Sequence, residues 1–332
     1  MLKTVFMLKA GVIGVGSMGQ NHARIYHENA NLVGVADLDK GAVKKVAERY
    51  NTKYYTDYKN LLKNVDAVSI AVPTVSHYKI AMDAISAGKH VLLEKPICSS
   101  VIDAEKLIQI ADEQGVVLAV GHTERHNPVV RFAKEALKKK RFGDVISIAA
   151  RRVSSFPFRI RDVGVILDLG IHDIDVIRYL AGGEVKSVYT LAGSIGNIKC
   201  EDHANILFNF DNGVSGFLEV NWLTPMKVRT LSLTCSKNFV ELDYMKQSVK
   251  ISSSKLVEYN VKDLFKTSFE FDVREISLKN EEPLRTEIYD FMNAIKKKRK
   301  PLVTGNDGLK ALQIALAAEQ SYKDGRQIGI GG

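Results

Sequence analysis

Two short segments carry side chains whose types and spacing suit proton transfer. Lys95 stands directly before Pro96 at the end of an apolar segment, where partial loss of water makes the neutral amine easier to reach. Asp168, His172 and Asp175 recur at the spacing that places side chains on one face of a helix. Histidine suits a general base near neutral pH, and a carboxylate one turn away can orient it or hold a substrate hydroxyl. These residues predict acid–base chemistry.

A third segment, AVPTVSHY at 71–78, follows another apolar run. Pro73 cannot extend a central strand, so the chain must turn there and can place Thr74 and His77 beside a ligand. Plainer interpretations stay open at this point. The segment can be an ordinary loop, Lys95 can face solvent, and His172 can be a structural histidine.

A glycine-rich turn lies near the start of the chain, between an apolar run and a helical pattern. Glycines at such a turn let the backbone approach a pyrophosphate, and the helix N-terminus favours its negative charge. Asp37 follows the next apolar run, where it can accept hydrogen bonds from ribose hydroxyls or cap a helix. Asp39 adds negative charge that favours NAD over NADP, although Lys40 opposes it. The expected loop ligands are Gly14, Gly16, Ser17, Met18 and Gly19.

The elements that must position these residues change in character along the chain. Up to about residue 120, short apolar runs alternate with helical patterns, which predicts crossover units and a parallel sheet. After residue 143, HANILFNF and VSGFLEVNW alternate apolar and polar residues, with a DNG turn at 211–213 between them. A helical segment over 161–183 ends in paired glycines, and a second apolar stripe runs from Leu284 to Ile295.

We therefore expect an α/β protein of two domains. Residues 1–124 should form a doubly wound parallel sheet of the Rossmann type that binds NAD. Residues 125–332 should form an α+β domain with a large, mainly antiparallel open sheet for substrate binding and oligomerisation. The length of the chain and its 45% hydrophobic residues are sufficient for two cores.

The formal charge of +9 favours an anionic partner, such as a nucleotide or a phosphorylated sugar. Basic runs at 138–141 and 296–300 follow amphipathic stretches and are expected to be helix ends rather than nucleic-acid sites. No membrane span or signal peptide is expected, because long apolar runs are absent from the sequence.

Three cysteines stand far apart without a zinc-binding spacing, which favours a reducing cytoplasmic location. His122 and His126 are four residues apart, but their segment lacks a helical pattern and has no neighbouring cysteine. We expect no metal ion. The usual motifs of acyl and phosphoryl transfer are also missing from the sequence.

Together these motifs resemble the Gfo/Idh/MocA oxidoreductases over essentially the whole chain. The resemblance runs through VIGVGSMGQNHA, Asp37, AVPTVSHY, the EKP motif at 94–96 and the pair Asp168 and His172. It implies that His172 takes the hydroxyl proton while hydride leaves for NAD, that Lys95 assists, and that Asp168 positions sugar hydroxyls. It also places Glu94 beside the cofactor and implies a homotetramer or homodimer formed through the open sheet.

Within the family, the segments around 164–175, 221–236 and 281–291 are most similar to nucleotide-sugar 3-dehydrogenases that oxidise UDP-N-acetylglucosamine or its uronic acid. Cations and a ring that could hold a UDP group are compatible with that similarity, although a solvated basic surface would explain them equally well. Beside Lys95, Asp168 and His172, the expected substrate ligands are Arg125, Asn127, Arg152, Arg159, Arg161, Trp222, Lys227 and Arg229.

Other functions remain open from sequence. An inositol or free-sugar dehydrogenase would use the same catalytic residues, and a relative that catalyses hydrolysis or C–C chemistry would keep its NAD bound. A non-catalytic NAD(H)-sensing regulator would be expected to have lost Lys95 or His172, and this chain has both.

Overall fold

The computed structural model describes residues 8–156, 163–195, 200–258 and 268–331. It divides into two compact units. The first contains Met1–Thr123 and Glu282–Leu312, and the second contains Glu124–Glu281 and Gln313–Gly332. The sequence predicted a boundary one residue later, after residue 124, but it did not predict that residues 282–312 return to the first unit.

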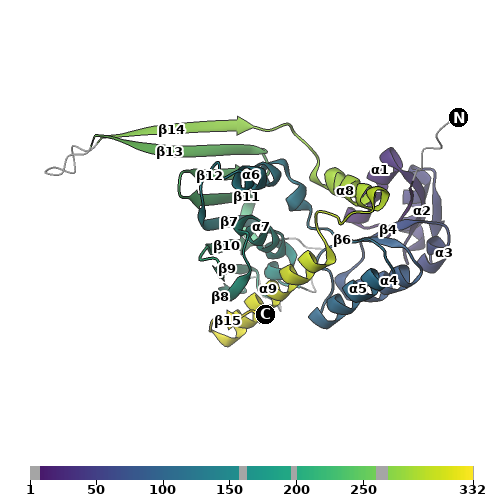
Figure 1. Cartoon of the computed structure of the whole chain (residues 1–332). Helices are drawn as coiled ribbons and strands as arrows, with labels where there is room; N and C mark the ends of the chain where they lie inside the picture. The colour runs from purple at the N-terminus through teal and green to yellow at the C-terminus, as the bar shows by residue number, and fades with distance from the viewer. Residues whose placement is uncertain (1–7, 157–162, 196–199, 259–267, 332) are drawn as a thin grey trace. The chain divides into compact units, whose positions relative to one another are not determined.

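The first unit is built on a six-stranded parallel sheet with the order β3-β2-β1-β4-β5-β6 (Figure 1). Its strands are β1 (Lys9–Ile13), β2 (Asn31–Ala36), β3 (Lys53–Tyr55), β4 (Ala67–Ile70), β5 (His90–Leu93) and β6 (Leu118–Val120). Its helical elements are α1 (Ser17–Asn29), α2 (Lys40–Arg49), α3 (Tyr58–Leu62), η1 (Thr74–Ser76), α4 (His77–Ser86), α5 (Val101–Glu113) and α8 (Pro283–Lys297). The strand order reverses direction between β1 and β4, the place where such sheets bind nucleotides.

The apolar stripe of α8 explains why the late segment joins the first unit. Leu284, Ile288 and Phe291 are almost fully buried in the same hydrophobic cluster as Val12 of β1 and Tyr26 of α1. Removing a stripe of this size from water is worth several kcal/mol at about 25 cal/mol per Å². The helix therefore supplies part of the core beneath the nucleotide-binding sheet.

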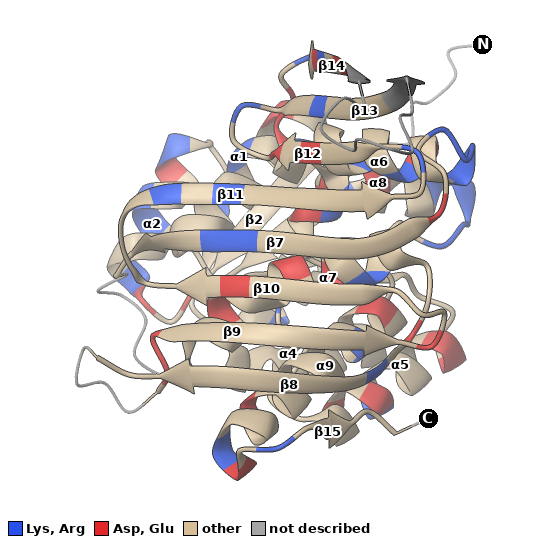
Figure 2. Cartoon of the chain, turned by 90° about the vertical axis from the view of Figure 1, so that its left-hand side faces the viewer, with Lys and Arg blue, Asp and Glu red and all other residues tan. Residues whose placement is uncertain are grey.

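The second unit is built on a nine-stranded sheet with the order β14-β13-β12-β11-β7-β10-β9-β8-β15 (Figure 2). Its strands are β7 (Val145–Ser155), β8 (Val185–Gly193), β9 (His203–Phe210), β10 (Ser215–Asn221), β11 (Leu223–Cys235), β12 (Phe239–Asp243), β13 (Ser248–Glu258), β14 (Ser268–Ser277) and β15 (Ile328–Gly329). β7 and β10 pair in parallel, and the other described neighbours are antiparallel. The predicted α/β class and mainly antiparallel second sheet are thus confirmed.

The alternating residue pattern places one face of this sheet against helices. In β9, Ala204, Ile206 and Phe208 are buried, whereas Leu207 between them is 53% exposed. Gly213 has a φ of +82° in the turn between β9 and β10, as the DNG motif predicts. The covering helices include α6 (Pro128–Lys138) and α7 (Ile171–Ala181), which lie behind the sheet in Figure 2.

The helix predicted over 161–183 is shorter and less regular in the structure. A π-helical turn, η3 (Ile166–Gly170), leads into α7, and the left-handed Gly182 ends that helix. The last helix, α9 (Gly305–Asp324), precedes β15. Among the described residues, none of the helices is long and apolar enough to cross a membrane.

Candidate active site

The glycine loop joins β1 to α1 in the first unit, and two of its glycines serve different needs. Gly14 has a φ of +90°, and a Cβ there would lie 2.3 Å from the carbonyl oxygen of Ala71. Gly16 has a φ of −64°, and a Cβ there would meet nothing within 4 Å. The fold therefore requires glycine at position 14, while the open space at Gly16 suits the close approach of a ligand.

The helix that follows this loop presents unblocked amides. The first residues of α1 are Ser17, Met18 and Gly19, and its first turn contains no acidic residue. The preceding residue, Gly16, has no side chain that could cap these amides. The free amides and the positive end of the helix dipole favour a phosphate group at this position. The loop thus fits the pyrophosphate of NAD.

Asp37 at the end of β2 holds the same loop. One carboxylate oxygen accepts a hydrogen bond from the amide of Val15 at 2.7 Å, and the other accepts from the amide of Asp39 at 3.0 Å. Asp39, not Asp37, caps α2 by accepting from the amides of Gly41 and Ala42. Asp37 therefore does not cap the helix, which was the alternative considered from sequence. Its remaining lone pairs can accept hydrogen bonds from ribose hydroxyls.

A cavity of about 370 Å³ opens beside this loop. Sequence reasoning found its glycines, Asp37 and Pro73, but it missed Thr56 and Tyr58, which follow the short strand β3. The hydroxyl of Tyr58 donates to Asp83 at 2.7 Å, and burial together with that carboxylate raises the pKa of Tyr58 to about 12. The full lining is Ile13, Gly14, Gly16, Ala36, Asp37, Leu38, Thr56, Tyr58, Ala71, Val72, Pro73, Ser76 and Ile80.

Lys95 follows β5 at the carboxyl edge of the parallel sheet, as predicted. It is half-buried, and the Lys95–Pro96 peptide bond is cis. His77 at the start of α4 lies beneath the same segment, where its ring nitrogens meet the carbonyl oxygens of Pro96 at 2.8 Å and Val72 at 2.9 Å. Thr74 of η1 is half-buried in the same loop.

Two residues of this edge are less accessible than the sequence suggested. His77 is 1% exposed, and burial lowers its pKa even though the two carbonyl groups favour the protonated ring. Glu94 is 8% exposed, and its two oxygens face the ring of His22 and the amide of Lys95. Both side chains therefore bind protein groups that support the backbone around Lys95.

The second unit positions Asp168 and His172 around the junction of η3 and α7. Both side chains are half-buried, so each keeps a surface toward solvent. Asp175 is fully buried in an ion pair with Arg125, so it is not accessible as the other two are. The π-helical turn changes the angular register between Asp168 and the rest of the helix. Asp168 and His172 are thus the two residues of this pattern that keep exposed surface.

Arg152 of β7 does not match its predicted role as a diphosphate ligand. It is 2% exposed and pairs with Asp173 of α7 and, at 3.0 Å, with Glu124. Burial opposes its charge, but Asp173 and Glu124 hold the pKa of Arg152 above its ordinary value. A buried cation that already faces two carboxylates has little capacity to bind a substrate phosphate.

Arg125 and Asn127 also belong to the interior. Arg125 makes a bidentate pair with Asp175 at 2.6 and 2.7 Å and lies over the ring of Tyr179. Asn127 is 3% exposed and caps α6 by accepting from the amide of Val129. Neither side chain is placed to close over a ligand, because each is committed to packing inside the second unit.

The remaining predicted substrate ligands differ in how exposed their side chains are. Trp222 is 2% exposed and packs edge-on against Phe156, so its ring is not available for stacking on a base. Lys227 of β11 is exposed. Arg229 is partly exposed and lies 3.5 Å from Glu124. Burial and the neighbouring Arg152 lower the pKa of Arg229, and nearby carboxylates, Asp168 among them, offset this only in part. Arg159 and Arg161 lie outside the described residues.

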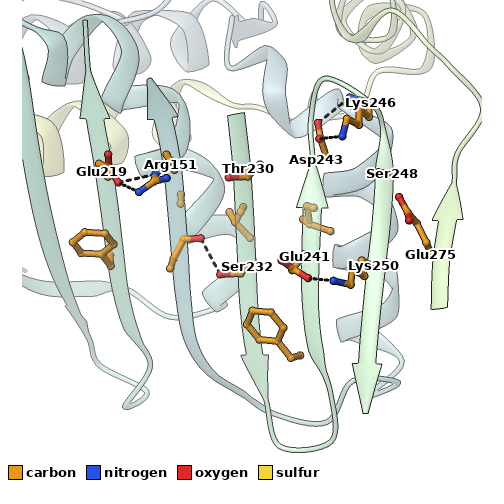
Figure 3. Close-up of a pocket in the computed structure, with 16 residues that line it drawn as sticks. Arg151, Glu219, Thr230, Ser232, Glu241, Asp243, Lys246, Ser248, Lys250 and Glu275 are labelled. Carbon is orange, nitrogen blue, oxygen red and sulfur yellow. Dashed lines mark hydrogen bonds and ion pairs between the residues drawn. The ribbon is translucent and has the colours of Figure 1, made fainter. Parts of the chain in front are cut away.

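A groove of about 500 Å³ on the open face of the large sheet contains none of these residues (Figure 3). Each of its cations is paired with a carboxylate: Arg151 with Glu219, Lys246 with Asp243, and Lys250 with Glu241. A groove whose cations and carboxylates neutralise one another offers no concentrated charge for an anionic substrate. This groove is therefore a weaker candidate site than the glycine-loop cavity of the first unit or the junction of η3 and α7 in the second.

Comparisons with known proteins agree with this geometry. Residues 8–122 match the oxidoreductase family with an NAD-binding Rossmann fold, and residues 130–241 match the GFO/IDH/MocA C-terminal domain. The chain is 30% identical to UDP-N-acetylglucosamine 3-dehydrogenase of Acidithiobacillus ferrooxidans, over 93% of this chain and 95% of the relative. It is 26% identical to myo-inositol 2-dehydrogenase of Thermotoga maritima, over 97% of this chain and 98% of that protein.

Solved structures show the same architecture. The structure of the A. ferrooxidans enzyme matches with a TM-score of 0.85 and 29% identity, covering 96% of this chain and 98% of the other. A levoglucosan dehydrogenase solved with NADH matches with a TM-score of 0.83 at 19% identity, covering 98% of this chain and 99% of the other, which supports the fold. The chain belongs to the GFO/IDH/MocA family and is an NAD-dependent oxidoreductase of the group that contains sugar and polyol dehydrogenases.

Proposed function

We propose that this enzyme oxidises a secondary hydroxyl of a nucleotide sugar, with C3 of UDP-N-acetylglucosamine as the first candidate. The observation that carries the proposal is the similarity to a UDP-N-acetylglucosamine 3-dehydrogenase along almost the whole of both chains. The same reaction on the uronic acid of that sugar is the nearest alternative, because Lys227 and Arg229 could also face a carboxylate.

In this proposal Lys95 comes from the first unit, and Asp168 and His172 come from the second. NAD, when bound, accepts the hydride that leaves the carbinol carbon. His172 takes the hydroxyl proton, and Asp168 accepts a hydrogen bond from a sugar hydroxyl. Lys95 donates a hydrogen bond to the reacting oxygen and helps to move its proton. The cofactor is held by the glycine loop, by Asp37 and by the loop of Pro73 and Thr74.

A second candidate follows from the buried arginines. Arg125 and Arg152 are engaged in internal ion pairs, which leaves fewer cations for a diphosphate than the sequence suggested. A substrate without phosphate, such as an inositol or a free sugar, needs no such cations. Inositol dehydrogenases are among the relatives, so this candidate is tested together with the first.

The deciding experiment is NADH formation followed at 340 nm with four substrates offered separately. These are UDP-N-acetylglucosamine, its uronic acid, free N-acetylglucosamine and myo-inositol. Turnover confined to one UDP sugar supports the proposal. Turnover of inositol or of the free sugar rejects the nucleotide-sugar assignment and supports the second candidate. If all four fail, NADH bound tightly to the purified protein would point to a reaction without net NADH release.

We also propose that the enzyme is a homo-oligomer that associates through the open face of its large sheet. Apolar side chains stand out on this face at alternating positions, among them Leu191 and Leu207, which are 61% and 53% exposed. Exposed apolar patches of this kind favour association. Light scattering after size exclusion should give a dimer or tetramer, and Leu207→Glu should shift it toward the monomer.

A further inference from the structure

A buried polar cluster lies behind Lys95 in the first unit, and Glu94 is at its centre. One oxygen of Glu94 lies 3.0 Å from Nε2 of His22, and the other accepts from the backbone amide of Lys95 at 3.2 Å. Burial alone would raise the pKa of Glu94, but His22 and Lys95 lower it below its ordinary value. A charged carboxylate thus holds the backbone of Lys95 from inside the fold.

His22 of α1 is oriented by a directional chain of hydrogen bonds. Its Nδ1 lies 3.0 Å from the hydroxyl of Ser69, which lies 2.9 Å from the hydroxyl of Tyr26. All three side chains are almost fully buried. Every group has a partner of the right kind if Tyr26 donates to Ser69, Ser69 donates to Nδ1, and Nε2–H donates to Glu94. The cluster therefore presents a fixed N–H donor to Glu94.

Glu287 of α8 completes this cluster from the far end of the chain. It is 3% exposed, and among the described residues no donor makes a hydrogen bond of regular geometry to its oxygens, although the hydroxyl of Thr123 is nearby. Ligating atoms of His22, Glu94 and Glu287 all lie within 4.8 Å of one another. Two carboxylates this close in a buried site would repel each other strongly if both were charged.

The groups that face Glu287 favour its neutral form. Burial and the negative charge of Glu94 raise the pKa of Glu287 well above its ordinary value, and Asp290 on the same helix adds to the effect. The nearby hydroxyl of Thr123 lowers it only in part. Tyr26 is also close, and its pKa is raised by burial and, in part, by Glu287. The one histidine in the cluster, His22, is already directed at Glu94.

We propose that His22 and Glu287 are positioning residues for Lys95, and that Glu287 acts as a neutral acid whose proton is shared with the carboxylate of Glu94. Glu94 is then held by donors from α1 and α8, and it holds the amide of Lys95 at the end of β5. The role of Lys95 in hydride transfer rests on the proposed function. The hydrogen-bond arrangement itself does not depend on the substrate.

The test compares Glu287→Gln, Glu287→Ala and the exposed control Glu105→Gln of α5. Glutamine has the same shape as a neutral glutamic acid and can still donate a hydrogen bond, so kcat should stay within about threefold of wild type. Alanine should lower kcat by about tenfold or more, with the KM for NAD changed by less than about twofold. Equal loss in the glutamine and alanine variants would show that the ionised carboxylate is needed and would overturn the proposal.

A second measurement does not need turnover. A carboxyl group whose pKa is raised on folding stabilises the protein fully below its ordinary value of 4.5, and this stabilisation is lost as pH rises toward the folded-state pKa. The Tm of Glu287→Gln relative to wild type should therefore increase as pH rises above about 5, whereas that of Glu105→Gln should stay constant.

The two measurements separate the possible failures. If no substrate is turned over but the Tm difference follows pH, the neutral acid stands and the proposed function has failed. A flat Tm difference overturns the neutral acid. A different outcome is that wild type binds Zn²⁺ or Mn²⁺ stoichiometrically and Glu287→Gln abolishes this binding. That result would overturn the neutral acid and show that the cluster is a metal site. Normal kcat in a folded Glu287→Ala variant would remove the positioning role.

Discussion

The two units differ in the groups that the polar side chains of their predicted sites bind. In the first unit, Asp37 and the glycine loop bond to backbone groups around an open cavity, and the space at Gly16 is left clear. In the second unit, Arg125 and Arg152 are enclosed by carboxylates of their own unit. A motif defined by backbone geometry therefore lies at an open cavity, whereas two cations selected from the sequence are buried in ion pairs.

The largest expected effect tests whether Arg152 is structural. Arg152→Met would leave Asp173 and Glu124 buried without their main partner, which should lower the free energy of unfolding by about 3–5 kcal/mol. Urea denaturation monitored by circular dichroism measures this loss. The neighbouring Arg151 pairs with Glu219 on the exposed face, so Arg151→Met should cost no more than about 1 kcal/mol. Similar costs for both variants would show that Arg152 is no more structural than the exposed Arg151 of the same strand.

The next effect tests the chemistry assigned to both units. Lys95→Ala and His172→Ala should each lower kcat by about 100-fold or more, equivalent to about 2.7 kcal/mol of transition-state stabilisation. NAD binding, measured by quenching of protein fluorescence, should change little in either variant. Lys106→Ala on the exposed face of α5 provides the control. Near-normal turnover in either catalytic variant would remove that residue from the mechanism.

A smaller effect separates the glycine that the fold needs from the glycine that the ligand needs. Gly16→Ala should leave the Tm of the unliganded protein unchanged, because its added Cβ meets nothing within 4 Å. It should weaken NAD binding by about tenfold, since the methyl group would occupy space beside the pyrophosphate. Gly14→Ala should instead lower the Tm, because its Cβ would lie 2.3 Å from the oxygen of Ala71. Equal NAD affinity in Gly16→Ala and wild type would refute a cofactor role for that space.

The smallest expected effect concerns the exposed cation of the second unit. Lys227→Ala should raise the KM for a UDP sugar by about three- to tenfold with little change in kcat, because an exposed lysine contributes modest binding energy to a phosphate. The KM for NAD measured in the same assays provides the comparison, since the proposed cofactor site lies in the first unit and this KM should not change. An equal rise in both KM values would argue against a contact with the substrate diphosphate.

The sequence was sufficient to predict the fold class and the nucleotide loop for a physical reason. Alternating apolar runs and helical patterns require a parallel sheet, and only a turn such as Gly14–Gly19 brings backbone amides to its edge. The family's NAD-binding domain and the similarity to NAD-dependent dehydrogenases confirm the family and the cofactor.

The burial of individual charged side chains could not be predicted from the sequence. Arg152 and Lys227 have the same sign of charge, but one faces the helices behind the sheet and the other faces solvent. Their difference depends on carboxylates such as Asp173, which come together with Arg152 only after folding. The π-helical turn at 166–170 was also invisible to periodicity, because it inserts an offset into an otherwise helical pattern.

The assignment of α8 to the first unit also matters while the protein is being made. The ribosome releases the sheet of the nucleotide-binding unit well before it has translated residues 124–281, and only then does it add Leu284, Ile288 and Phe291. Until those residues emerge, the nascent sheet exposes the apolar surface around Val12 and Tyr26 that they later cover. The nucleotide-binding unit therefore cannot reach its mature packing until α8 has been synthesised, and a chain that stops before α8 would display a surface for chaperones or aggregation.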